Sequence, residues 1–228
     1  MLDAWGDANV AAAIGLLGGV LLGLAARLGR FCTLGAIEDY LYGNNDKRLR
    51  MWLLAIGVAV VGSFGLMAFD LFDPAKSFYL SQQWSPLASI VGGLLFGYGM
   101  AMAGTCGFGA LARLGGGDLR SFVIVIVIGI SAYVTMSGPL AWIRVAMFPP
   151  AQPAFSPNGF AHAIGTFSGL PVAMIGLIIG CLLIGLALSA GSLRQDRSMM
   201  FWAVVVGIAV TGGWAGMGYV NANGFEDL

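Results

Sequence analysis

Six segments of this chain are long enough and apolar enough to cross a membrane. A helix needs about 20 predominantly apolar residues to span the hydrocarbon layer of a bilayer. Such segments, almost free of charge, cover about residues 10–29, 50–69, 87–104, 121–138, 169–190 and 200–219. Hydrophobic residues make up 58% of the 228 positions and charged residues 10%, which leaves too little polar side chain to coat a soluble globule. The sequence therefore predicts an all-α fold, a polytopic membrane helix bundle.

One cysteine-containing stretch occurs twice in the chain. When Cys32 is placed over Cys106, glycines before and after the two cysteines also superpose. The identical pairs are Gly18/Gly92, Gly19/Gly93, Leu21/Leu95, Gly23/Gly97, Gly35/Gly109 and Ala36/Ala110. This pattern predicts an internal repeat. We expect a single transmembrane domain over 1–228, with repeat one at about 10–70, repeat two at about 87–138, and further helices at 169–190 and 200–219.

Pairs of glycines spaced by four residues recur in the apolar segments. Small residues at this spacing let two helices approach closely in lipid. We therefore expect helix contacts at four pairs, which are Gly19/Gly23, Gly93/Gly97, Gly176/Gly180 and Gly212/Gly216.

Each repeated cysteine falls where its apolar segment ends and a glycine-rich stretch begins. Short second helices are expected beyond the two breaks, over 38–42 and 110–113. Non-helical backbone at membrane depth is tolerated only where protein or a water-filled cavity satisfies its polar groups. A helix that begins just after a cysteine directs its first amides toward the sulfur, which favours an anion there. We therefore predict broken or re-entrant helices whose cysteine loops form an anion site.

The candidate site residues surround the two thiols. A neutral thiol donates a weak hydrogen bond and suits a soft sulfur atom, whereas a thiolate would repel an anion. We expect protonated thiols that contact an anion transiently while backbone amides bear most of its charge. The residues in this prediction are Cys32, Cys106, Gly35, Gly104, Thr105, Gly107, Gly109 and Arg30. The alternative is a pair of structural cysteines buried between packed glycines.

The remaining polar residues exclude several functions. Zero net charge without a basic run leaves no electrostatic basis for nucleic-acid binding. Three cysteines without a CxxC pair predict neither a disulfide framework nor a zinc site, and we expect no cofactor. Cys181 is expected to be a small buried residue of an apolar helix. His162 is expected to be a surface or capping residue in an aqueous loop over 139–171, with a short interfacial helix at 140–147.

The distribution of lysine and arginine predicts the orientation of the chain. The loops after segments one, three and five contain nine of these residues, and the other side contains Lys76 and Arg144. The nine are Arg27, Arg30, Lys47, Arg48, Arg50, Arg113, Arg120, Arg194 and Arg197. Because positive loops stay in the cytoplasm, both termini should be periplasmic and both cysteine segments should run inward in parallel. The first segment lacks the positive region of a cleavable signal peptide and should remain as an anchor.

Two motifs resemble the paired signatures of a known family. They are GRFCTLGA at residues 29–36 and GYGMAMAGTCGFG at residues 97–109. Over about 14–120 the chain resembles the YeeE/YedE membrane proteins. That resemblance implies uptake of sulfur compounds, thiosulfate above all, across the bacterial inner membrane, with cysteines in central loops passing the ion along. Cys32 and Cys106 match those positions. Longer members have a second half with a further cysteine motif, which Cys181 lacks, so the chain is either a fragment or a short member that pairs with another subunit.

Three functions fit these observations. The leading one is an inner-membrane permease for a small sulfur-containing anion such as thiosulfate, which is not an enzyme. The second is a membrane thiol enzyme that moves sulfane sulfur or electrons through Cys32 and Cys106. The third is a half-pore subunit of a two-component sulfur transporter. The expected partners are the lipid bilayer, a homologous subunit or a downstream sulfur-carrier protein. No acidic residue stands out inside a segment as a proton or sodium site, which favours facilitated movement.

Overall fold

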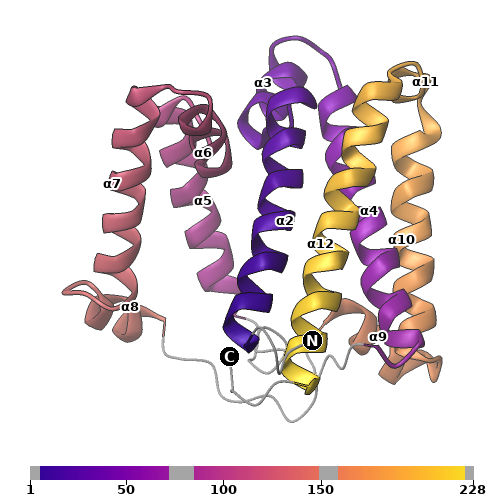
Figure 1. The fold of residues 1–228 in the computed structure, drawn as a ribbon. Helices are drawn as coiled ribbons and strands as arrows, with labels where there is room; N and C mark the ends of the chain where they lie inside the picture. Colours follow the sequence, from indigo (N-terminus) through magenta and orange to yellow (C-terminus); the bar gives the residue numbers. More distant parts are fainter. Residues whose placement is uncertain (1–5, 72–84, 149–158, 224–228) are drawn as a thin grey trace.

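The regular structure of this chain is helical. The computed structural model describes residues 6–71, 85–148 and 159–223. Within these ranges every regular element is a helix, and six stretches are long and apolar enough to cross a membrane, which confirms the predicted all-α membrane bundle (Figure 1). The helices are α2 (Asp7–Leu28), α3 (Thr33–Leu41), α4 (Lys47–Ala68), α5 (Pro86–Ala103), α6 (Gly107–Gly115), α7 (Leu119–Met136), α8 (Ala141–Met147), α9 (Phe160–Ser168), α10 (Val172–Ser189), α11 (Gly191–Arg194) and α12 (Arg197–Asn223).

Four helices form the closely packed part of the molecule. Helix α4 contacts α10 and α12, and α12 also contacts α2 (Figure 1). Glycines bring α4 and α10 backbone to backbone: a Cβ on Gly57 would lie 3.1 Å from the carbonyl oxygen of Gly180, and one on Gly180 would lie 3.2 Å from that of Gly57. A Cβ on Gly207 of α12 would lie only 2.6 Å from the side chain of Val58 of α4. In lipid, such close contact replaces the hydrophobic effect as the force between helices.

The glycine pairs only partly mark helix contacts. Gly176 and Gly180 contact α4, and Gly216 contacts Ile14 of α2. At the other members of the four pairs an added Cβ would meet no described atom within 4 Å, so the described chain shows no helix contact there: Gly19, Gly23, Gly93, Gly97 and Gly212. On α2 and α5 these glycines face sides that have no neighbouring helix within the described ranges.

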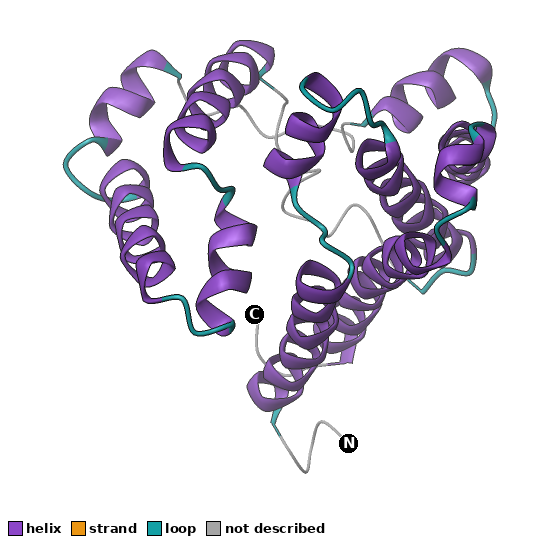
Figure 2. Ribbon diagram, turned by 90° about the horizontal axis from the view of Figure 1, so that it is seen from above, coloured by secondary structure: helices purple, strands orange, loops and turns teal. Residues whose placement is uncertain are grey.

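The helices of the second predicted repeat stand beside this packed group. Helix α6 packs against α7 and contacts α2, and α7 contacts α8. Figures 1 and 2 show α5 to α8 as a group next to α2. Within the described chain, Met100 is the one buried residue of α5. The contact between α2 and α6 therefore joins the two groups of helices, next to the two cysteine loops.

Both cysteine segments have the same local build. Each consists of a long helix, a break at the cysteine and a helix of nine residues, which is α3 after Cys32 and α6 after Cys106. Helices α2 and α5 run in the same direction, from the lower to the upper end of Figure 1. This agrees with the predicted parallel course. The duplication and the boundaries of its repeats stay predictions.

Two expectations about the last third of the chain were wrong. Cys181 is exposed rather than buried. Helix α10 turns Gly180 toward α4, and the next residue, about 100° further around the helix, faces outward. Residues 160–168 form helix α9 rather than loop. His162 lies half-buried on α9, and burial lowers the pKa of its imidazole. The predicted interfacial helix is α8, while residues 149–158 lie outside the described ranges.

The nine cationic residues used for orientation all lie toward one end of the bundle. They occupy the end of α2, the start of α4, the end of α6, the start of α7 and the turns around α11, at the upper end of Figure 1, whereas α8 with Arg144 lies at the lower end. Asp46 accepts hydrogen bonds there from Arg50 of α4 and from Ser192 of α11, so that the second bond joins the start of α4 to α11. The hydrogen bond from Arg50 holds the pKa of Asp46 below its usual range. The cationic residues counted for orientation are therefore gathered at one end of the folded bundle.

The packing of α12 on α4 predicts opposite effects for two glycine substitutions on α12. A Cβ at Gly207 would lie 2.6 Å from Val58 and 2.9 Å from the carbonyl oxygen of Ala55, so Gly207→Ala should destabilise the protein by about 1–3 kcal/mol. Gly212→Ala adds a methyl group in open space and should be neutral or slightly stabilising, because alanine favours helix. Thermal unfolding of both variants in detergent measures the difference. Equal melting temperatures would contradict this packing.

Candidate functional site

The two repeated cysteines meet in space. Cys32 is the N-cap residue of α3 and Cys106 the N-cap residue of α6, both with extended backbone. Their sulfur atoms lie 3.7 Å apart. Cys106 is buried and Cys32 is half-buried. Because the two cysteines are 74 positions apart in sequence, only the tertiary fold brings the thiols together.

Backbone amides of both short helices point at this thiol pair. The N–H of Gly109 donates a hydrogen bond to the Cys106 sulfur at 3.2 Å. The amides of Thr33 and Leu34, the first two residues of α3, also interact with the Cys106 sulfur. The positive ends of two helices are therefore both directed at the Cys106 sulfur, whereas the sequence predicted one such helix end at each cysteine. The anion site itself stays a prediction.

Gly109 lies against both thiols. A Cβ at this position would lie 3.4 Å from the Cys106 sulfur, 3.5 Å from the Cys32 sulfur and 2.9 Å from the hydroxyl oxygen of Thr105. Thr105 itself is buried, and its hydroxyl donates to the carbonyl oxygen of Cys106. A methyl group at 109 would therefore displace the Thr105 hydroxyl and lie in van der Waals contact with both thiols.

Gly35 makes room for a guanidinium group. A Cβ at Gly35 would lie 2.5 Å from one terminal nitrogen of Arg48 and 2.7 Å from the other. From that position Arg48 donates to the carboxylate of Asp39 at 3.1 Å and to the carbonyl oxygen of Arg30 at 2.8 Å. Arg30 has a φ of 52°, in the left-handed region that few residues other than glycine adopt. Arg48 thus holds the bend that presents Cys32.

The other two predicted glycines differ in their roles. Gly104 ends α5 with a φ of 64°, so that a left-handed residue turns the chain toward Cys106. Gly107 has no close neighbour, since a Cβ there would first meet the Ile128 side chain at 4.0 Å. Gly107 is therefore next to the site in sequence without shaping it.

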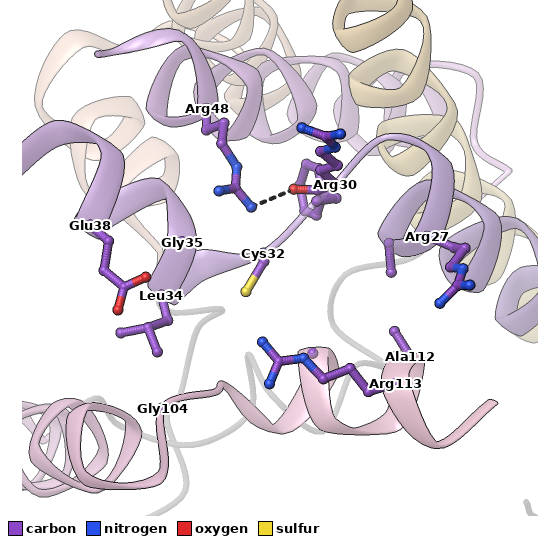
Figure 3. Close-up of a pocket in the computed structure, with 13 residues that line it drawn as sticks. Arg27, Arg30, Cys32, Leu34, Gly35, Glu38, Arg48, Gly104, Ala112 and Arg113 are labelled. Carbon is purple, nitrogen blue, oxygen red and sulfur yellow. Dashed lines mark hydrogen bonds between the residues drawn. The ribbon is translucent and has the colours of Figure 1, made fainter. Parts of the chain in front are cut away.

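A cavity of about 360 Å³ opens beside Cys32. Its lining includes Arg30, Gly35, Gly104 and Gly109 from the prediction (Figure 3). It also includes charged residues that sequence reasoning missed: Arg27, Glu38, Arg48 and Arg113. Arginine content alone did not point to them, because cationic residues at one end of a membrane helix are ordinary. Arg27, Glu38 and Arg113 lie five to seven positions from a cysteine, which was the available signal, whereas Arg48 lies 16 positions after Cys32 on α4 and had no such local signal.

The site combines soft and hard partners for an anion. The thiol of Cys32 provides a polarisable contact, and the guanidinium groups provide positive charge and planar hydrogen-bond donors. Among the described residues no group of three or more metal-ligating side chains is present. Such a lining, with guanidinium groups and a sulfur atom in its wall, suits an anion better than a cation.

The separation of the two sulfur atoms predicts that mild oxidation links Cys32 to Cys106. In a Cys181→Ser background, copper phenanthroline with oxygen should remove two electrons and two protons from the pair and form one disulfide, because 3.7 Å needs little movement to reach a bond of about 2.0 Å. Intact mass should fall by two hydrogen atoms and recover with reductant. A Cys32→Ser variant should show no such change. Two alkylatable thiols after oxidation and unfolding would contradict this geometry.

Comparison with known proteins identifies relatives in transport. Residues 28–225 match the family model described as sulphur transport. The thiosulfate transporter TsuA of Escherichia coli (strain K12) is 34% identical over 109 residues, which are 48% of this chain and 30% of that protein. The thiosulfate transporter TsuA of Spirochaeta thermophila is 24% identical over 219 residues, which are 91% of this chain and 62% of that protein.

These matches cover different shares of the proteins. The chain spans less than two thirds of the length of the curated relatives that it matches. The family model, in contrast, covers most of the chain and includes both cysteine loops. On this match, and in agreement with the two motifs, the chain belongs to the sulphur transport family, the YeeE/YedE family of membrane proteins.

Proposed function

We propose that this chain carries the path of a small sulfur-containing anion, thiosulfate, in a permease of the bacterial inner membrane. The observation that supports this most is the pair of thiols 3.7 Å apart at two converging helix ends, with Cys32 in the wall of a cavity of about 360 Å³. Membership of the sulphur transport family and the names of the two relatives agree with it. The same findings favour a transporter over a membrane thiol enzyme.

The thiols act in this proposal as transient contacts. Thiosulfate has a soft terminal sulfur and a hard group of three oxygens. A protonated thiol donates a weak hydrogen bond to the soft end, and no covalent bond forms. Backbone amides such as that of Gly109 stabilise negative charge near the pair. Because each contact is weak, the ion leaves as readily as it enters, which a transport path needs.

The charge asymmetry supports an orientation for this path. The cationic end of the bundle, with Arg113 and Arg48, faces the cytoplasm by the rule that positive loops stay inside. The first residue of α2 and the last residue of α12 then lie on the periplasmic side. Thiosulfate reaches the thiol pair from the periplasm and leaves through the arginine-lined cavity. Downstream consumption of the ion, for example by a sulfur-carrier protein, drives the net flux.

Replacing Cys106 should abolish transport without unfolding the protein. Cys106→Ala removes the sulfur that accepts from Gly109, and uptake of radiolabelled thiosulfate by cells or proteoliposomes should fall by at least about tenfold. Gly109→Ala should act in the same direction, since its methyl group would lie against both thiols. Cys181→Ala is the matched control, because Cys181 lies on an exposed face of α10.

Two outcomes would contradict the proposal. Undiminished uptake in a well-folded Cys106→Ala variant would show that the thiol pair is not on the path. A stable persulfide on Cys32 or Cys106 after turnover, detected by intact mass, would instead favour the thiol-enzyme alternative.

An observation on α5 favours a further membrane segment as partner in the path. This helix is exposed on nearly all sides within the described chain, and an added Cβ at Gly92, Gly93, Gly97 or Gly99 would meet no described atom within 4 Å. Glycine-rich faces of this kind suit another helix better than lipid. A homologous polypeptide or a second copy of the chain fits this face.

This partner hypothesis predicts that Gly93→Leu disrupts assembly but not folding. The leucine would fill the open face of α5 and keep another helix away. Native mass spectrometry of the protein in mild detergent should show a smaller assembly for Gly93→Leu than for the unsubstituted protein. A monomer in both cases, with full thiosulfate uptake by the purified chain alone, would contradict it.

A further inference from the structure

The arginines of the cavity are arranged asymmetrically around Cys32. Arg48 lies on one side of the Cys32 thiol and Arg113 on the other (Figure 3). In this view the guanidinium of Arg113 points back along α6 toward the sulfur, whereas the side chains of Arg30 and Arg27 extend away from it. Arg48 and Arg113 are therefore the two arginines whose side chains are directed toward the thiol in this view.

These two cations differ in what they already bind. Arg48 is half-buried and committed to the Asp39 carboxylate and the Arg30 carbonyl oxygen. The guanidinium of Arg113 makes no hydrogen bond and no ion pair with any residue in the described ranges. Within the part of the chain that the structure describes, all of its donors are therefore available. A guanidinium without a partner beside a thiol is suited to a ligand that carries oxygens and sulfur together.

The charge of the cavity matches that of a dianion. Four guanidinium groups, those of Arg27, Arg30, Arg48 and Arg113, line it, and Glu38 is its acidic lining residue. The Asp39 carboxylate, paired with Arg48, is the second negative charge nearby. Two positive charges remain in excess, and they equal the charge of thiosulfate or of sulfate.

We propose that Arg113 is a substrate-binding residue that holds the oxygen end of thiosulfate while the terminal sulfur of the ion faces Cys32. This deepens the proposed transport function, on which it rests. The arginine recognises sulfur-bound oxygens, which thiosulfate and sulfate both carry. The thiol recognises the terminal sulfur, which sulfate lacks. Affinity for dianions and preference for a sulfur-containing one are therefore assigned to two different side chains.

Equilibrium binding of two radiolabelled anions to the purified protein separates these roles. Arg113→Gln should weaken both thiosulfate and sulfate binding by roughly tenfold to a hundredfold, the effect of removing a charged hydrogen-bond donor. Arg113→Lys should recover part of the loss, because it restores the charge without the planar fork. Cys32→Ala should weaken thiosulfate binding and leave sulfate binding unchanged.

The matched control is Arg120→Gln. Arg120 lies at the same end of the molecule, on α7, and does not line the cavity. The Arg120→Gln variant should bind both anions as the unsubstituted protein does. Melting temperatures should show that all variants are folded. If Arg113→Gln and Arg113→Lys bind sulfate as Arg120→Gln does, Arg113 is an ordinary interfacial arginine and the proposal is overturned.

The same measurements distinguish this proposal from the transport function. Normal thiosulfate uptake and normal anion binding in Arg113→Gln would overturn the arginine site and leave the permease intact. Sulfate binding that depends on Arg113, in a protein that transports no thiosulfate, would support the anion site and overturn the permease. Loss of thiosulfate binding alone in Arg113→Gln would also overturn the proposal. The arginine would then not bind the oxygens that thiosulfate and sulfate both carry.

Discussion

The contact between the two helix breaks is the interaction on which the site depends. Each break exposes backbone groups that are costly in a membrane unless protein or water satisfies them. Here the Cys106 sulfur of the second break serves as an acceptor for both breaks, since the amides that begin α3 and the amide of Gly109 in α6 all face it. Without the second loop, the amides that begin α3 would lack this acceptor. The thiols thus lie where the fold already needs polar atoms.

The rest of the molecule supports this contact unequally. Helices α4, α10 and α12 pack through glycines at backbone distance and form a firm support for α2. On the other side, α5 has little contact with described residues, and α6 carries the link to α2. The first cysteine loop is therefore fixed to a packed group of helices, whereas the second is attached mainly through the site itself. The gap between the sulfur atoms therefore depends on how α5 to α7 stand beside α2.

Sequence reasoning predicted the spanning helices, the breaks and the residues at the thiols because each has a local cause. Apolar length gives a span, and a cysteine among glycines at the end of a span gives a break. Gly35, Gly104 and Gly109 were predicted from the two cysteine motifs, and the structure gives each a separate reason: room for Arg48, a left-handed turn and contact with both sulfur atoms. Gly107 shares the motif without such a reason. The motif thus identified the loop, but not which of its glycines matter.

The parts that sequence did not predict depend on contacts between distant segments. Arg48 and Arg113 belong to helices that no local pattern connects to Cys32, and Gly93 looked like a helix contact although no described atom covers it. The case of Arg48 shows why this matters for function. Its guanidinium makes no described hydrogen bond to either sulfur atom. It does bind the Asp39 carboxylate after Cys32 and the carbonyl oxygen of Arg30 before it, where the backbone is left-handed. The position of the thiol is thus fixed by a residue of the neighbouring helix α4, and through α4 by the packed group of helices behind it.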